Sequence, residues 1–197
     1  MENNKAFTLG GIARPTLLLT AICTTVTLLL ALTNLLTVGR IARNAEVKAA
    51  ESRHKVLEAA DYIPANADGT VYKAFDAEDR LIGVVVTIKA GGYGGTIEVM
   101  TGIRADGGVS GVNILSMEET PGLGAKAKED SFLRQFKGLT DSGAAVNKDG
   151  GDIDALSGAT ITSRAVTKAV NEAVEISRSY LTLPEGQDHK ITAGGKE

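Results

Sequence analysis

The sequence predicts one membrane-spanning helix followed by a single α+β domain, in which a twisted antiparallel sheet packs against helices. Three observations lead to this prediction. Residues 15–38 contain no charge, residues 70–117 alternate apolar and polar side chains, and residues 163–181 carry apolar side chains at helical spacing. A period near two is typical of strands and a period near 3.6 is typical of helices.

The chain divides into five predicted segments. They are a short tail (1–14), a transmembrane helix (15–38), a helical connector (39–62), a folded domain (63–182) and a polar, disordered tail (183–197). The uncharged segment is long enough to cross a bilayer core, which takes about 20 apolar residues in a helix. A cleaved signal peptide is the alternative. We favour a retained anchor, because the segment exceeds a usual signal-peptide core and no small-x-small cleavage site follows it.

The folded domain is predicted to contain an antiparallel meander. Residues 71–75 and the β-branched run 81–89 predict two strands, and residues 96–104 and 109–117 predict two more. The Asp106-Gly107 pair between the last two is typical of a hairpin.

Two helices are predicted after the meander. Residues 128–137 predict a short helix, with Phe132, Leu133 and Phe136 on one face. Residues 163–181 predict a longer helix, and Thr162 or Ser163 is placed to cap it. Its apolar stripe consists of Val166, Ala169, Val170, Ala173 and Val174.

Composition excludes several classes of protein. The net charge is −3 and no long basic run occurs, so we expect no nucleic-acid partner. The single cysteine, Cys23, excludes an intramolecular disulfide and cysteine-ligated zinc or iron–sulfur sites. His54 and His189 lie far apart in polar surroundings, so we predict no metal site. Redox chemistry on this chain would therefore need an organic cofactor.

The first candidate site is the 154–160 turn, DALSGAT, which precedes the last helix. Gly158 and Ala159 have almost no side chain, so a large reagent can reach the Thr160 hydroxyl. The start of the helix offers free N–H groups and the positive end of the helix dipole, which favour a phosphate. Asp154 could bond N–H groups of the turn or help the hydroxyl to lose its proton. The alternative is that the hydroxyl residues here serve only as turn and cap residues.

The second candidate is the 118–124 loop, EETPGLG. Its Pro-Gly pair favours a type II turn. Gly122 and Gly124 would let a flat ring system approach the backbone, although a simple strand-to-helix connector is the alternative.

The third candidate is the glycine-rich 91–95 loop, with Tyr93 at its centre. It lacks the lysine of a P-loop and does not match the dinucleotide-binding pattern, so we interpret it as a flexible loop with one aromatic residue.

These three loops, in this order behind an N-terminal anchor, resemble the FMN-binding subunits of two related membrane complexes. One is the G subunit of the Rnf (Rsx) complex, an ion-translocating ferredoxin:NAD+ oxidoreductase. The other is the C subunit of the sodium-translocating NADH:quinone reductase. The resemblance covers residues 10–181, and the compact length favours the Rnf protein.

The resemblance implies that residues 63–182 form an FMN-binding domain and that Thr160 carries FMN covalently, as an ester of the flavin phosphate. It implies an attachment loop formed by Ser157, Gly158 and Ala159. The other residues assigned to the cofactor are Asp154, Glu119, Thr120, Pro121, Gly122, Leu123, Gly124 and Tyr93. No residue is assigned as catalytic, because such a protein relays electrons and has no independent turnover.

The resemblance also implies partners and a location. The partners are other subunits of the complex, membrane lipid, and a flavin transferase that uses FAD and magnesium. The location is the inner membrane, with residues 1–14 in the cytoplasm and the flavin domain outside. Basic residues are more frequent after the span than before it, which by the positive-inside rule predicts the opposite orientation. We follow the resemblance, because long translocated domains obey that rule poorly.

Two other functions are compatible with parts of the sequence. A non-redox, membrane-anchored binding module would use the loops only as turns, and the purified protein would be colourless. A free-standing flavin reductase would need a nicotinamide or quinone site, for which we find no motif.

Overall fold

The computed structural model describes residues 9–181, which form parts of two compact units, Met1–Val47 and Lys48–Glu197. The tail predicted at 183–197, with His189, and residues 1–8 of the first tail lie outside the described residues.

Helix α1 (Leu9–Val56) contains the predicted span and is long and apolar enough to cross a membrane. It begins at Leu9, before Pro15, where we expected the span to start. Pro15 therefore lies inside the helix, where its missing N–H removes one hydrogen bond. The leucines of the span are exposed, as lipid contact requires. The Thr25 and Thr27 hydroxyls each donate to a carbonyl four residues earlier, at 2.8 Å, so the helix itself satisfies them.

The second unit contains a five-stranded antiparallel sheet in the order β1-β2-β3-β4-β5. The strands are β1 (Asp61–Pro64), β2 (Val71–Phe75), β3 (Leu81–Gly91), β4 (Thr96–Arg104) and β5 (Val109–Ser116). The predicted meander is confirmed, including the hairpin at Gly107, whose φ is +83°. Strand β1 was not predicted. It is a short edge strand ending in proline, so its own sequence carries too little alternation to show it.

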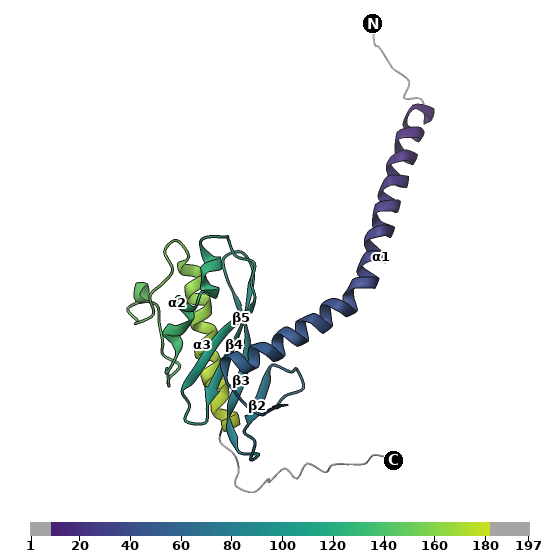
Figure 1. Ribbon diagram of the computed structural model, residues 1–197. Helices are drawn as coiled ribbons and strands as arrows, with labels where there is room; N and C mark the ends of the chain where they lie inside the picture. The colour runs from purple at the N-terminus through teal and green to yellow at the C-terminus, as the bar shows by residue number, and fades with distance from the viewer. Residues whose placement is uncertain (1–8, 182–197) are drawn as a thin grey trace, which may run out of the picture. The chain divides into compact units, whose positions relative to one another are not determined.

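Helix α3 (Thr160–Leu181) runs along one face of the sheet (Figure 1). All five residues of its predicted apolar stripe are buried, and they form the main core with strand residues such as Val84, Val86, Ile97 and Val99. The stripe therefore determines which side of α3 meets the sheet.

The other face of the sheet is covered by the end of α1, where Val56 and Leu57 pack on Ala74, Val85 and Met100. Glycines make this close contact possible. A Cβ atom added to Gly102 would lie 2.4 Å from the Val56 carbonyl oxygen, far inside van der Waals distance. The Arg53 guanidinium also stacks over the Tyr72 ring, 4.2 Å from its centroid. The last turns of α1 are thus part of the folded domain, although we predicted a separate connector there.

Where one helix was predicted at 128–137, the chain forms two short pieces, and a third short piece precedes them. They are η1 (Gly124–Lys128), α2 (Asp130–Leu133) and η2 (Arg134–Phe136). Glu129 is extended, with ψ at 140°, and separates η1 from α2. The predicted apolar face is nevertheless buried, because Phe132, Leu133 and Phe136 all enter the main core.

A further short piece, η3 (Asn147–Asp149), is tied to α3 by an ion pair. Arg164 Nε donates to Asp149 Oδ2 at 2.7 Å. This hydrogen bond lowers the pKa of Asp149 below its ordinary value. The pair holds the segment before the 154–160 turn against the start of α3.

Candidate functional site

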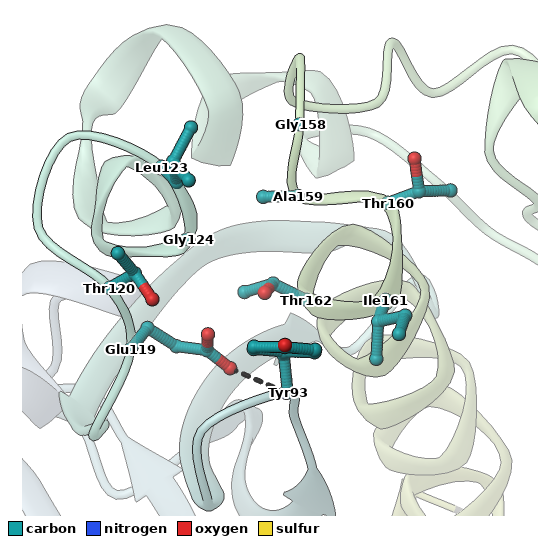
Figure 2. Close-up of a pocket in the computed structure, with 10 residues that line it drawn as sticks. All are labelled: Tyr93, Glu119, Thr120, Leu123, Gly124, Gly158, Ala159, Thr160, Ile161 and Thr162. Atoms are coloured by element: carbon teal, nitrogen blue, oxygen red, sulfur yellow. Dashed lines mark hydrogen bonds between the residues drawn. The ribbon is translucent and has the colours of Figure 1, made fainter.

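A pocket of about 560 Å³ lies where the three loops singled out in the sequence meet (Figure 2). The 91–95 loop joins β3 to β4, the 118–124 loop follows β5, and the 154–160 turn leads into α3. The residues that line the pocket are Tyr93, Glu119, Thr120, Leu123, Gly124, Gly158, Ala159, Thr160, Ile161 and Thr162. Segments almost 70 positions apart in sequence numbering, at 93 and 162, therefore build one site.

Eight of the twelve residues assigned from the sequence line this pocket. The four that do not are Asp154, Ser157, Pro121 and Gly122. Two lining residues were missed, Ile161 and Thr162. The sequence held a signal for Ile161, because it is an apolar residue that lies off the apolar stripe of the last helix. In the structure it is 49% exposed.

The 118–124 loop has the predicted turn. Leu123 N–H donates to the Thr120 carbonyl at 3.1 Å, and Gly122, third in this four-residue turn, has a φ of +78°. A type II turn needs a positive φ at this position, which glycine adopts without strain. Pro121 and Gly122 therefore shape the turn, while Thr120, Leu123 and Gly124 face the pocket.

The 154–160 turn is held by hydrogen bonds to neighbouring side chains. The Asp154 carboxylate accepts a hydrogen bond from the Asn147 side chain at 3.0 Å, and Asn147 in turn accepts one from Ala155 N–H at 3.3 Å. Asp154 N–H donates to Gln135 at 2.7 Å. The structure thus places Asp154 in the support of the turn, outside the pocket lining, and leaves Ser157 exposed.

The expected cap at Thr162 or Ser163 is wrong, because α3 begins earlier, at Thr160. Both residues lie inside the helix and are buried. Ser163 accepts a hydrogen bond from Leu156 N–H at 2.9 Å, so its hydroxyl joins the turn to the helix and does not cap the helix. This bond brings the turn down onto α3, and the first three residues of the helix then reach the pocket.

Thr160 is consequently the first residue of α3, at the pocket wall and half-buried. The first N–H groups of an α-helix have no partner within the helix. These groups and the helix dipole favour an anion at this end. Gly158, two residues earlier, has a φ of +74°, a conformation that allows the sharp entry into the helix.

Thr162 is a lining residue with an unusual feature. Its side chain is 1% exposed, and its hydroxyl oxygen has no hydrogen-bond partner among the described residues. Leaving a buried hydroxyl unpaired is unfavourable by about 1–3 kcal/mol. A Cβ atom added to Gly124 would lie 2.8 Å from the Thr162 hydroxyl oxygen, so the lack of a side chain at Gly124 lets the 118–124 loop pack closely on the start of α3.

The rest of the wall is mostly apolar. Tyr93, Leu123 and Ile161 are 74%, 44% and 49% exposed, and among the described residues they are the large exposed hydrophobics outside α1. Exposed apolar side chains gathered at one pocket are typical of a ligand site. Together with the helix start, they suit a ligand that combines a flat ring system with a phosphate, which fits FMN.

Comparison with known proteins agrees with this geometry. Residues 92–175 match the FMN-binding domain family, a range that includes every pocket-lining residue. The G subunit of the proton-translocating ferredoxin:NAD(+) oxidoreductase complex of Clostridium ljungdahlii is 48% identical over 100 residues, which are 49% of this chain and 54% of that protein. The G subunit of the ion-translocating oxidoreductase complex of Methanosarcina acetivorans is 35% identical over 147 residues, 69% of this chain and 76% of that protein.

A solved structure is also similar. The C subunit of the Na(+)-translocating NADH-quinone reductase from Parabacteroides distasonis shares 26% identity, with a TM-score of 0.48 over 58% of this chain and 63% of that one.

Fold and site together define a class of protein, an FMN-binding domain carried behind a helix able to span a membrane. Within this class, the chain belongs to the family of G subunits of ion-translocating oxidoreductase (Rnf) complexes, because it matches most of the length of the Methanosarcina protein. The chain spans about half the length of the clostridial relative.

Proposed function

We propose that this protein is a membrane-anchored flavoprotein that relays electrons within an ion-translocating ferredoxin:NAD+ oxidoreductase complex. The observation that carries the proposal is the pocket at the start of α3. Thr160 lies there beside apolar side chains and the hydroxyl of Thr162, which has no hydrogen-bond partner within residues 9–181. The FMN-binding family match over the same residues and the names of the relatives support it.

We further propose that FMN is bound covalently, through a phosphate ester on the Thr160 hydroxyl. The N–H groups at the start of α3 would hold the phosphate, and Tyr93, Leu123 and Ile161 would cover the isoalloxazine ring. FMN supplies one- and two-electron redox chemistry, while the protein supplies position and electrostatics. The protein then acts as a carrier, and its substrates are the redox groups of neighbouring subunits.

The ester needs a helper enzyme, because a threonine hydroxyl is a weak nucleophile without a base or metal to activate it. Within residues 9–181, no group of three His, Cys, Asp or Glu side chains is placed to bind a metal ion. We therefore propose a flavin transferase that uses FAD and Mg²⁺. In its reaction the Thr160 oxygen would bond to the phosphorus on the FMN side of FAD, AMP would leave, and the hydroxyl proton would pass to a base of the transferase.

Expression of the full chain with and without such a transferase tests this function. With the transferase, we expect a protein that stays yellow after denaturation and precipitation and that gains the mass of one FMN less one water. Without it, we expect a colourless precipitate with unchanged mass. Spontaneous labelling of the purified chain by FAD alone would contradict the need for a transferase. A colourless precipitate even with the transferase would contradict covalent attachment, and a native protein without any bound flavin in both preparations would contradict the function.

We also propose that the anchor lies in the inner membrane and that the flavin domain is outside the cytoplasm. Covalent attachment supports this orientation, because a lost flavin could not easily be replaced there. The anchor would keep the flavin close to partner subunits and raise its effective concentration near them.

The orientation can be tested by labelling introduced cysteines with a reagent that does not cross the membrane. Lys168 is exposed on α3, so Lys168→Cys in a Cys23→Ser background should react with a membrane-impermeant maleimide on intact spheroplasts. The matched control, Asn4→Cys in the same background, should react only after lysis. The reverse pattern would show that the positive-inside count predicts the topology and that the resemblance does not.

A further inference from the structure

The Glu119 carboxylate connects two loops of the pocket (Figure 2). Its Oε1 atom accepts hydrogen bonds from the backbone N–H groups of Tyr93 at 2.8 Å and Gly94 at 3.4 Å. Hydrogen bonds to an ionised acceptor are about twice as strong as neutral ones. These bonds tie the 91–95 loop, which carries the exposed Tyr93 ring, to the 118–124 loop. Along the chain the two loops are separated by strands β4 and β5.

Glycines on both sides leave room for this carboxylate. A Cβ atom added to Gly92 would lie 2.2 Å from Glu119 Oε1, and one added to Gly124 would lie 2.6 Å from Oε2. The carboxylate therefore occupies space that side chains at these two positions would otherwise fill. Oε2 lies on the side of Gly124 and Thr162, whose atoms face the pocket.

Glu119 also dominates the electrostatics of the site. Of the ten described residues that line the pocket, it is the one with an acidic or basic side chain apart from the Tyr93 phenol. The others are glycine, alanine, hydroxyl-bearing or apolar residues. Glu119 is half-buried, and a charge in such surroundings acts more strongly on its neighbours than it would in water.

We propose, building on the function proposed above, that Glu119 is a positioning residue that also sets the redox potential of the site. Its hydrogen bonds hold the 91–95 loop, and thereby Tyr93, against the pocket. Its negative charge opposes the arrival of electrons at the ring system, because reduction adds negative charge beside a carboxylate. Glu119 thus keeps the potential of this carrier lower than the same pocket would without the charge.

Three variants of the full chain separate these two roles. Glu119→Gln keeps an oxygen that can accept hydrogen bonds from the two N–H groups, but it removes the negative charge. Glu119→Ala removes both. Glu118→Gln is the matched control, since it removes one charge from the adjacent residue, whose side chain is exposed and outside the pocket lining.

Potentiometry of the flavin-loaded proteins tests the charge. At a fixed ambient potential, Glu119→Gln and Glu119→Ala should raise the reduced-to-oxidised ratio by about tenfold, which is about 30 mV for a two-electron couple. Glu118→Gln should change the ratio much less. An unchanged ratio in Glu119→Gln, or an equal change in Glu118→Gln, would overturn the proposed effect on the potential.

Hydrogen exchange in a flavin-free Thr160→Ala background tests the positioning without any cofactor. In the peptide that covers residues 91–95, Glu119→Ala should accelerate amide exchange about tenfold, because the two N–H groups lose their acceptor. Glu119→Gln should restore most of the protection, and unchanged exchange in Glu119→Ala would overturn the positioning role. A wild-type protein that carries no flavin even with the transferase would instead overturn the proposed function, and the exchange measurement would still report on Glu119.

Discussion

Thr160→Ala should yield a folded protein that has lost all covalently bound flavin. The substitution removes the one hydroxyl at the first position of α3, where the N–H groups and the dipole favour the phosphate. Thr160 is only half-buried, so the effect on stability should be small, about 0.5 kcal/mol or less. The measurement is the mass and colour of the denatured protein after expression with the transferase.

Two matched variants make the Thr160 result specific. Thr160→Ser keeps a hydroxyl at the same position and should retain part of the adduct. Thr162→Ala removes the neighbouring pocket hydroxyl, which is buried and unpaired among the described residues, and should leave the mass adduct in place. If Thr160→Ala keeps the adduct and Thr162→Ala abolishes it, the attachment residue is Thr162 and our assignment is wrong.

Gly124→Val should lower the flavin content and shift the visible absorbance of the flavin that remains. A Cβ atom at this position would lie 2.6 Å from Glu119 Oε2 and 2.8 Å from Thr162 Oγ1, so the valine must displace one side of the pocket wall. Overpacking of this kind typically costs about 1–3 kcal/mol. We expect the damage at the binding site, measured as flavin per protein and as the absorbance maximum, to exceed the loss of thermal stability.

The matched control for this variant is Gly107→Val in the β4–β5 hairpin. Gly107 has a φ of +83° and open space around its Cβ position, so valine there strains the backbone. The hairpin lies at the opposite end of β4 and β5 from the 91–95 and 118–124 loops. It should lower the melting temperature and leave the flavin spectrum unchanged. Wild-type spectra and flavin content in Gly124→Val would mean that the 118–124 loop is only a connector.

Local sequence patterns determined the main elements of this protein. The uncharged run specified an apolar helix, and alternation specified four of the five strands, with β2 and β4 at the predicted bounds. The five apolar residues at helical spacing specified the buried side of α3. These elements can be predicted from the sequence because each apolar pattern repeats over many residues, and one residue that departs from the pattern does not obscure it.

Only the tertiary structure decided where α1 ends and that its last turns belong to the domain. Val56 and Leu57 are held by residues of the sheet, and the glycine that admits Val56, Gly102, is 46 positions further along the chain numbering. A local sequence pattern cannot predict a contact between residues that far apart in the chain. For the same reason β1 was missed, since its four residues become a strand only by pairing with β2.

The site shows the same division. Three loops could be identified in the sequence from their glycines, a Pro-Gly turn and a threonine before a helix. Eight of the twelve residues assigned on this basis line the pocket. The sequence could not show that Ser163 draws the turn onto α3 or that Glu119 bonds to the loop of Tyr93. Nor could it separate Thr162 from a cap residue. The Glu119 bond joins segments 26 positions apart, which only folding brings together. The roles of Ser163 and Thr162 depend on where α3 begins and which of its residues are buried, and packing decides both.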